Sequence, residues 1–327
     1  MGQITNFPFG ASSFGVPMFG AGGLIPVPGN VYFVDQANGL DGNTGDSPDR
    51  ALKTLSRAHT MMTANQNDTA VVIGSNATIA VRETATLAWS KDLCHIIGAM
   101  AFNRHAHRVS IRAASGSSFT PLVSVTADGC LFANFHAFHG YDSDVAQICW
   151  QDAGERNAYA AIHFGGMGHA TAAANAGGRS FKFAGGGERY FSDCVFGLDT
   201  TDKTTTANAE VEFAGAVREV FDRCILQTYG SGAHAMVIVG AAGLDRYALM
   251  RDCTFINPIQ SATTALTECF SCTAGTSPNG AIILQNPLSY GCGPWEADVE
   301  TGRVVLLGHP TPATTDGSGL AGAPESP

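Results

Sequence analysis

The sequence predicts an all-β fold, a parallel β-helix with an extended N-terminal arm and a short capping helix. Three similar six-residue runs predict it, because each has a large apolar residue first, a cysteine fourth and an aspartate between them: 191–196, 221–226 and 250–255. Their cysteines, Cys194, Cys224 and Cys253, are 30 and 29 residues apart. A period of this size marks stacked supersecondary units. The absence of helical patterns between the strands favours a β-helix over a propeller or a leucine-rich horseshoe.

The composition agrees with many short strands joined by tight turns. Charged residues make up 14% of the chain and hydrophobic residues 45%, with 39 glycines. The charge content is well below the roughly 25% of an average soluble domain. A formal net charge of -10 argues against nucleic-acid binding. No apolar run approaches the roughly 20 residues that a membrane span needs, and no signal peptide is visible.

Residues 1–28 are predicted to form the extended apolar arm. No charged residue precedes Asp35, and aromatic, proline and glycine residues alternate without a helical or strand period. Two interpretations stay open, a coil that wraps the chain's own domain and an arm that docks on a partner protein. In the second, the partner contacts would come from six apolar side chains: Phe7, Phe9, Phe14, Phe19, Leu24 and Ile25.

Residues 29–68 are predicted to form a strand, a turn-rich loop and the capping helix. Ser47 can cap this helix with Pro48 at its first position. Its apolar face would run from Ala51 through Leu55 to Met62, as a lid over the open end of the core. Residues 69–307 are predicted to be the β-helix itself, roughly eight coils of that period. Residues 308–327 are a Pro/Gly-rich tail.

Strict alternation within each run predicts which side chains face inward. Matching positions of stacked coils lie about 4.8 Å apart, so the three cysteines should form an inward column. A second inward column would contain Phe196, Leu226 and Phe255. The same alternation places Phe191 on the opposite side of the strand from Cys194.

Acidic residues near the turns are candidates for glycosidase chemistry, which needs two carboxylates about 5 to 10 Å apart. Two sets qualify: Asp142, Asp144, Asp152 and Glu155 form the first, and Asp193, Asp222 and Asp252 the second. We interpret both sets as exposed carboxylates that accept hydrogen bonds from turn backbone. No cluster of lysines and arginines suited to calcium-assisted elimination stands out in the sequence.

No metal or cofactor site is predicted. His107, His136 and His163 are 29 and 27 residues apart and can stack as a column of hydrogen-bonded imidazoles. Cys269 and Cys272 form one CxxC without a second pair at metal-binding spacing, so the nine cysteines are interpreted as small buried hydrophobes. The segment 41–46 lacks the later acidic ligands of a calcium loop and is interpreted as a turn.

Several N-terminal stretches carry a resemblance to known proteins. Residues 29–35, 39–48 and 51–55 resemble the start of pectate-lyase-like right-handed β-helices, which implies a right-handed coil. Residues 5–10 and 12–17 resemble the N-terminus of tailed-phage virion proteins built on that fold. Together the resemblances imply a structural protein of the phage head that acts as a homotrimer.

From these resemblances we predict a non-enzymatic capsid decoration (cement) protein. It would bind the major capsid protein through its N-terminal arm, on the capsid surface of a virion assembled in the host cytoplasm, without nucleic acid, membrane or cofactor. The alternative is a tailspike or fibre protein that binds or cleaves host surface glycans. A third reading is a free-standing polysaccharide lyase, against which the missing signal peptide counts.

Overall fold

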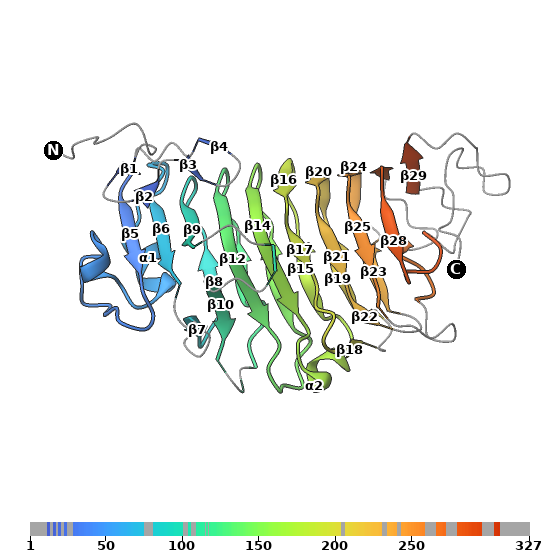
Figure 1. Cartoon of the computed structure of the whole chain (residues 1–327), viewed down its shortest axis with the longest axis horizontal. Helices are drawn as coiled ribbons and strands as arrows, with labels where there is room; N and C mark the ends of the chain where they lie inside the picture. The colour runs from blue at the N-terminus through green and yellow to red at the C-terminus, as the bar shows by residue number, and fades with distance from the viewer. Residues whose placement is uncertain are drawn as a thin grey trace.

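The chain winds into a right-handed parallel β-helix whose coils stack along one long axis, as the computed structural model shows (Figure 1). The structure describes residues 29–74, 81–100, 104–105, 109–114, 116, 118–203, 207–230, 234–240, 243–258, 266–272, 280–295 and 304–307, and the backbone of four short strands between residues 12 and 24. The predicted fold class is confirmed. The described helices make up only 6% of the chain.

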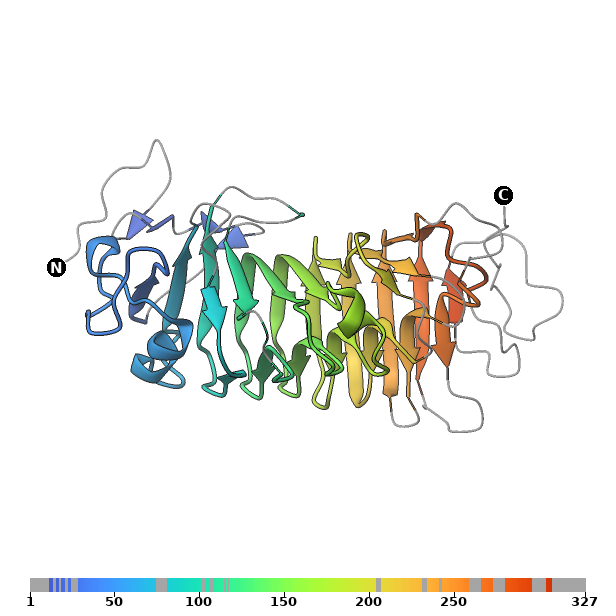
Figure 2. The same ribbon diagram turned by 90° about the horizontal axis from the view of Figure 1, so that it is seen from below.

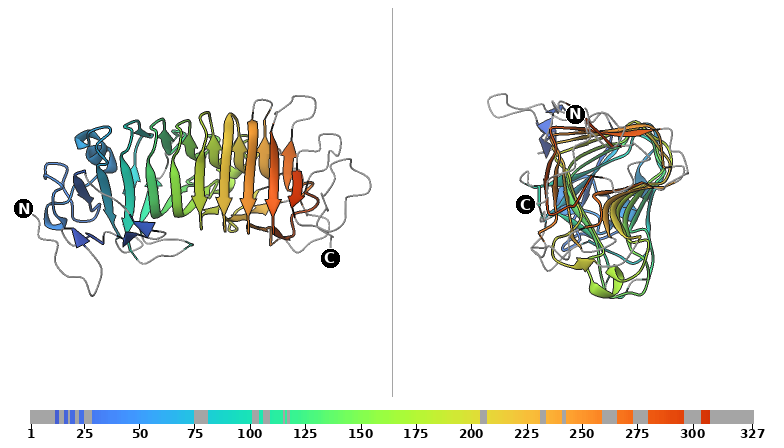
Figure 3. Two further views of the ribbon diagram at one scale, coloured as in Figure 1. Left: turned by 90° about the horizontal axis from the view of Figure 1, so that it is seen from above. Right: turned by 90° about the vertical axis from the view of Figure 1, so that its right-hand side faces the viewer.

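Parallel strands of successive coils lie side by side and build three faces, named here A, B and C (Figure 3). Face A contains β5 (Val31–Val34), β6 (Thr69–Ile73), β9 (His95–Ala99), β16 (Arg189–Ser192), β20 (Ala216–Asp222), β24 (Leu244–Arg251), β27 (Ala281–Gln285) and β29 (Val304–Leu307). Face B contains β7 (Val81–Glu83), β10 (Ser110–Ala113), β17 (Val195–Phe196), β21 (Ile225–Gln227), β25 (Thr254–Ile256) and β28 (Leu288–Tyr290). The long strands β12 (Leu131–His139) and β14 (Ala158–Gly166) bend and belong to both faces.

Face C is a separate seven-stranded sheet, which corresponds to about six full turns of the solenoid. It contains β8 (Leu87–Trp89), β11 (Val123–Val125), β13 (Ile148–Asp152), β15 (Arg179–Phe183), β19 (Ala209–Phe213), β23 (Ala235–Val239) and β26 (Phe270–Cys272). The spacing predicted roughly eight coils. The number of full turns is lower than predicted because the coils at both ends lack a described strand on face C. At the N-terminal end β5 and β6 precede β8, and at the C-terminal end β27 and β29 follow β26.

The capping helix occupies the N-terminal end, where face C has not yet begun (Figure 2). A 3₁₀ turn, η1 (Pro48–Arg50), precedes the helix α1 (Leu55–Met61), whose N-cap is Thr54. The structure therefore differs from the prediction of one helix that starts at Pro48. Leu52 forms a parallel bridge with Val34 of the sheet, so the backbone is extended between the two helical segments. Leu55 and Ala58 are fully buried, as the predicted apolar face requires.

Seven short elements complete the described secondary structure. Helix α2 (Ala170–Ala173) lies beside a two-stranded ladder of β18 (Asp202–Lys203) and β22 (Tyr229–Gly230), on the loops between faces B and C. In the N-terminal arm, β1 (Ser12–Ser13) pairs with β2 (Val16–Pro17), and β3 (Phe19–Gly20) pairs with β4 (Gly23–Leu24), both antiparallel. The sequence predicted no regular strand there, because ladders of two residues are too short to produce a period.

A sharp corner turns the chain from face A to face B in each coil. One residue at this corner has a left-handed backbone: Asn134, Ala161, Asp193, Arg223, Asp252 and Asn286 have φ between 50° and 61°. Asn and Asp tolerate this conformation better than other non-glycine residues. Because the corner reverses the alternation, Phe191 and Cys194 both point inward, and the prediction that they lie on opposite sides was wrong.

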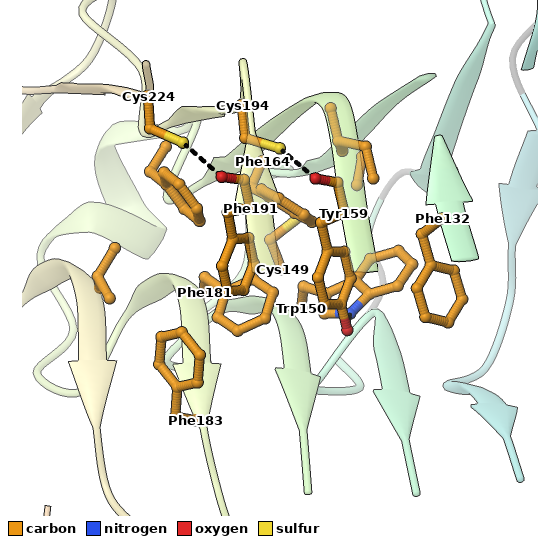
Figure 4. Packing of buried hydrophobic residues seen from close by; sticks show 14 of the residues in the cluster. Phe132, Cys149, Trp150, Tyr159, Phe164, Phe181, Phe183, Phe191, Cys194 and Cys224 are labelled. Atoms are coloured by element: carbon orange, nitrogen blue, oxygen red, sulfur yellow. Dashed lines mark hydrogen bonds between the residues drawn. The ribbon is translucent and has the colours of Figure 1, made fainter. Parts of the chain in front are cut away.

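Stacked aromatic and cysteine side chains fill the solenoid (Figure 4). Phe191 lies between Tyr159 and Phe221, with ring centroids 4.7 Å apart on either side. Cys194 and Cys224 are fully buried, and their thiols donate to the backbone carbonyls of Tyr159 and Phe191 at 3.6 and 3.7 Å. The predicted cysteine column and its neighbouring column of Phe196, Leu226 and Phe255 are therefore confirmed as core.

Two groups of charged side chains are also fully buried. In the first, Arg189 donates to Asp152 and to Glu219 at 2.9 Å each. In the second, the Lys203 ammonium lies 3.0 Å from Glu210. Glu210 also accepts a hydrogen bond from the Ser180 hydroxyl at 2.7 Å. In both groups the buried charged side chains are paired with oppositely charged ones, which offsets the cost of removing them from water. None of these side chains is exposed to solvent.

Candidate functional site

Outer side chains of face A form three parallel rows that run along the long axis. The central row is apolar and consists of Tyr190, Val220, Leu249 and Ile283, which are paired in register from β16 to β27. Two residues away on the side of the corner, the corner row consists of Ser192, Asp222, Arg251 and Gln285. Two residues away on the other side, the distal row consists of Glu188, Arg218, Tyr247 and Ala281, and Arg156 extends it by one coil toward the N-terminus.

Beside the corner row, Arg223 holds two carboxylates at once. Its Nη2 donates to Asp193 Oδ2 at 2.9 Å, and its Nη1 donates to Asp222 Oδ2 at 2.6 Å. The Tyr190 hydroxyl donates to the same oxygen of Asp222 at 3.0 Å. Arg104 pairs with the other oxygen of Asp193. We call this group, with Arg251, the corner cluster: Arg104, Tyr190, Asp193, Asp222, Arg223 and Arg251.

The cations of the corner cluster stand outermost and the carboxylates lie beneath them. The side chains of Asp193 and Asp222 expose 15% and 12% of their surface, whereas Arg223 exposes 49%. Arg251 exposes 40%, and its Nε lies 3.6 Å from Asp222 Oδ1. An incoming ligand therefore meets guanidinium groups and the Tyr190 ring before it meets a carboxylate.

Ionisation in the corner cluster follows from these contacts. Burial raises the pKa of Asp193, but hydrogen bonds from Arg223 and Ser192 and the charges of Arg104 and Arg223 outweigh it, so the pKa is lowered overall. Burial and the hydrogen bond to Asp222 raise the pKa of the Tyr190 hydroxyl. The hydrogen bond to Asp193 raises the pKa of Arg223 further. At neutral pH, Asp193 is therefore ionised and Tyr190 keeps its proton.

The structure brings together part of the second predicted carboxylate set. Asp193 and Asp222 meet through Arg223, whereas Asp252 accepts a hydrogen bond from Asn286 at 3.2 Å one coil further on. We predicted that these carboxylates accept bonds from turn backbone. That interpretation was wrong for Asp193 and Asp222, because arginines from neighbouring coils lie within ion-pair distance of both.

The first predicted carboxylate set does not form a site. Asp152 is buried inside the solenoid beside Arg189. Asp142 is exposed and lies 3.6 Å from His169, and Glu155 contacts Arg156 at 4.0 Å on the surface. Asp144 is exposed. These four residues therefore occupy different environments and do not converge.

Four side chains of the corner cluster were missed in the sequence: Arg104, Tyr190, Arg223 and Arg251. Arg104 reaches Asp193, and Arg251 reaches Asp222, only because the coils stack. Arg223 had a detectable signal, since it directly precedes Cys224 as Asp193 precedes Cys194. The column before the cysteines thus alternates acid, base, acid, which predicts ion pairs between adjacent coils.

Two of the three predicted column histidines stack on face B. His136 and His163 are paired in register, with ring centroids 4.6 Å apart. His163 Nε2 contacts the carbonyl oxygen of Gly197 at 2.8 Å, and His105 packs against His163 edge to face. His107 lies outside the described residues. Among the residues that the structure describes, no three His, Cys, Asp or Glu side chains converge as metal ligands.

The turn at residues 41–46 and the cysteines both have structural roles. Asp41 accepts hydrogen bonds from the backbone amides of Lys53 and Thr54 at 2.9 Å, so its carboxylate anchors the loop before α1. All nine cysteines are buried and unbridged, including Cys269 and Cys272. Within the described part of the chain, no helix is long and apolar enough to cross a membrane.

The predicted partner-binding residues of the arm are not tested here. Phe7, Phe9, Phe14 and Ile25 lie outside the described residues. Phe19 and Leu24 form a backbone pair between β3 and β4, and only their backbone is described. Contact with a capsid through these six side chains stays a prediction.

Comparison with known proteins identifies the fold. No family model and no curated protein matches the chain. Among solved structures, the pectin methylesterase from Aspergillus niger is similar with a TM-score of 0.52 and 14% identity, over 86% of this chain and 81% of that chain. A rhamnogalacturonan lyase is similar with a TM-score of 0.51 and 13% identity, over 80% and 68%. The tailspike protein gp49 of Acinetobacter baumannii bacteriophage Fri1, a capsular polysaccharide depolymerase, reaches a TM-score of only 0.37 at 8% identity over 89% and 65%, and carries no inference.

This comparison contradicts the prediction of a non-enzymatic protein. The similar solved structures are enzymes, pectin methylesterases and a rhamnogalacturonan lyase, although identity this low establishes the fold alone. The prediction followed from the resemblance of residues 5–10 and 12–17 to phage virion proteins, and the absence of a basic cluster in the linear sequence supported it. The stacked coils gather Arg104, Arg223 and Arg251 around two carboxylates.

Proposed function

We propose that this protein acts on a polysaccharide at the corner cluster on face A. The observation that carries the proposal is the pairing of two carboxylates, Asp193 and Asp222, with exposed guanidinium groups and an exposed tyrosine ring. Support at the level of fold comes from the enzymes that share it, whose substrates are polysaccharides by their names. This function matches the glycan-binding or glycan-cleaving alternative better than capsid decoration.

The cluster contains the groups that such chemistry needs. Asp193 is ionised at neutral pH and supplies a fixed negative charge that can stabilise a developing positive charge. The Tyr190 hydroxyl keeps its proton, because its pKa is raised, and shares it with Asp222, so it acts as a fixed polar group and not as a proton donor. The Tyr190 ring offers an apolar surface for the face of a sugar ring. Asp222 orients Tyr190 through the 3.0 Å hydrogen bond.

A location on a phage particle remains compatible with this function. A virion location, a homotrimer and contact with the major capsid protein are not tested by the structure and stay predictions. A tailspike or fibre that binds or cleaves host surface glycans would combine a virion location with polysaccharide chemistry.

The proposal is tested with the purified full chain and a panel of acidic and neutral polysaccharides. Retention in affinity electrophoresis reports binding, and release of reducing ends, unsaturated sugars or methanol reports chemistry. We expect at least one polymer to be retained, and Tyr190→Ala to weaken its retention by about tenfold, since stacking on an aromatic ring is worth on the order of 1 kcal/mol.

A matched control is Tyr229→Ala. Tyr229 is exposed to 38%, close to the 40% of Tyr190, but lies on the ladder with β18 away from the corner cluster. Its replacement should leave retention unchanged. If no acidic or neutral polymer is retained or altered, or if both tyrosine variants behave alike, the proposed function is contradicted.

A further inference from the structure

A lysine and a glutamate meet in a fully buried position where the loops between faces B and C join face C. Lys203 belongs to β18 on these loops, and Glu210 belongs to β19 of face C. Neither side chain is exposed to solvent, and Lys203 Nζ lies 3.0 Å from Glu210 Oε1. Nζ also donates to the backbone carbonyl of Leu198. An amine and a carboxyl group are therefore held in contact away from solvent.

The contact between Lys203 and Glu210 is close in distance but lacks the geometry of a hydrogen bond. Glu210 Oε1 has no hydrogen-bond partner among the described residues, although Nζ lies 3.0 Å from it. Buried carboxylate oxygens normally accept well-aligned hydrogen bonds. A buried pair of charges offsets the loss of hydration only when its geometry is good. This pair is therefore in contact without being optimised as an ion pair.

The carboxyl group of Glu210 is fixed from its other side. The Ser180 hydroxyl donates to Oε2 at 2.7 Å, and the Gly166 amide donates to that hydroxyl at 3.0 Å. Gly197 packs directly beside the carboxyl group, since a Cβ added to it would lie 2.6 Å from Glu210 Cδ. A hydroxyl that donates to a carboxyl oxygen stabilises negative charge that develops there during attack on the carbon. The carboxyl carbon is therefore both immobilised and polarised.

An imidazole completes the buried group. His234 Nε2 lies 3.7 Å from Glu210 Oε1, the oxygen that Lys203 also touches, and 3.0 Å from the Thr228 hydroxyl. Burial lowers the pKa of His234 by more than the contact with Glu210 raises it, so the ring is neutral at neutral pH. A neutral imidazole at this place can accept a proton and pass it on.

Proton transfer has to precede any reaction between the two groups, because an ammonium nitrogen has no lone pair. Burial raises the pKa of Glu210, but the charge of Lys203 and the contact with His234 outweigh it and lower the pKa to about 2, so the pair starts charged. Loss of hydration penalises both charged forms and brings the neutral amine and carboxylic acid closer in free energy than they are in water. The neutral pair is a minor state, so we expect a reaction that is slow relative to folding.

We propose that Lys203 and Glu210 form an intramolecular isopeptide bond once the solenoid has folded. The deprotonated Nζ attacks Cδ of Glu210 and forms an N–C bond, and one C–O bond of the carboxyl group breaks. The leaving oxygen departs as water with two protons that came from Nζ, transferred with the help of His234. An ammonium and a carboxylate thus become an amide and one water, and no other reactant is consumed. The bond removes two charges from the interior and is independent of the chemistry at the corner cluster.

The experiment is mass spectrometry of the purified full chain under denaturing conditions. The intact mass should be lower than the sequence mass by one water. Trypsin should fail to cut after Lys203, so residues 190–218 should appear as one peptide that is lighter by one water, instead of as 190–203 and 204–218. Chain that is dissolved in urea before it has folded should have the full mass and lose water only after refolding.

Variants and an internal control locate the bond. Lys203→Arg keeps the positive charge but has no amine nucleophile, so it should keep its full mass. His234→Gln should lower the rate of water loss after refolding by about 10², the usual contribution of a general base. The control is Lys182, which lies 3.4 Å from Glu212 in a partly exposed pair, and trypsin should cut after it as usual.

The folded wild type decides the proposal even if no variant folds. An intact mass equal to the sequence mass, with normal cleavage after Lys203, overturns the isopeptide bond. A loss of water that is already present in the unfolded chain, or that Lys203→Arg retains, places the dehydration elsewhere and overturns it as well. An unchanged rate of water loss in His234→Gln overturns the role of the imidazole.

Discussion

Replacing Glu219 by Gln is expected to flatten the dependence of stability on pH. Glu219, Asp152 and Arg189 are fully buried, and one guanidinium faces two carboxylates. Burial first, and repulsion by Asp152 in addition, raise the pKa of Glu219 to about 8, although Arg189 lowers it in part. Glu219 therefore keeps a proton in the folded state over a pH range in which the unfolded chain releases it.

The magnitude follows from the gap between the folded and unfolded pKa values. The folded value of about 8 stands against an ordinary value of 4.5, and each unit is about 1.4 kcal/mol, so the gap represents about 5 kcal/mol. The folded state binds more protons between these values, so the free energy of unfolding falls as pH rises through this window. The contribution is fully present below the unfolded pKa and is lost above the folded one.

The assay is urea unfolding of the wild type and Glu219→Gln at several pH values between 4.5 and 8. The variant keeps one of the two acceptor oxygens, so it loses one of the hydrogen bonds from the Arg189 backbone amide at 3.1 Å and the Arg189 Nη1 at 2.9 Å and starts less stable by a constant amount. The readout is the slope: the wild type should lose up to about 1.4 kcal/mol more per pH unit than the variant. Glu155→Gln, at an exposed position, should keep the wild-type slope. Equal slopes for wild type and Glu219→Gln would refute the reasoning.

Three further predictions concern the core and the arm. Phe255→Ala should cost about 3 to 5 kcal/mol in urea unfolding, because the side chain is fully buried, whereas Leu288→Ala at a 67% exposed position should stay within about 0.5 kcal/mol. A small loss for Phe255→Ala would contradict its place in the core. Thiol reagents should not label the native column cysteines, and rapid labelling without denaturant would contradict the register: Cys194, Cys224 and Cys253. Deletion of residues 2–24 should leave the melting temperature nearly unchanged, since the solenoid begins at β5, and an unfolded product would show that the arm belongs to the core.

The fold was predictable because the coil repeats a chemically distinct residue. Cys194, Cys224 and Cys253 mark one position of the coil, and the period followed from them. The spacing of His136 and His163 likewise predicted their stacking. The rule that strand side chains alternate between inside and outside gave the wrong orientation at the corner. There the left-handed backbone of Asp193 (φ 54°) bends the chain and interrupts the two-residue period.

The site was only half predictable, since its acids and bases come from different coils. Asp193 and Asp222 were visible as carboxylates near a cysteine, whereas the bonds from Arg223 to Asp193 cross from one coil to the next. Arg104 reaches Asp193 across 89 positions of sequence, a distance at which no local motif exists. A search for basic residues close in sequence therefore misses arginines that the stacking of coils brings together.

The most direct test of the account uses the polysaccharide that the protein retains in affinity electrophoresis. The measurement is the rate at which the wild type, Asp222→Asn and the control Asp49→Asn form product from it. Asn keeps the shape of Asp222 but removes its charge from Arg223 and Tyr190, which lie 2.6 and 3.0 Å away. The account predicts that Asp222→Asn lowers the rate by about 10² or more while the exposed Asp49→Asn leaves it unchanged. An undiminished rate in Asp222→Asn, with the fold intact by circular dichroism, would contradict the assignment of the corner cluster as the site of polysaccharide chemistry.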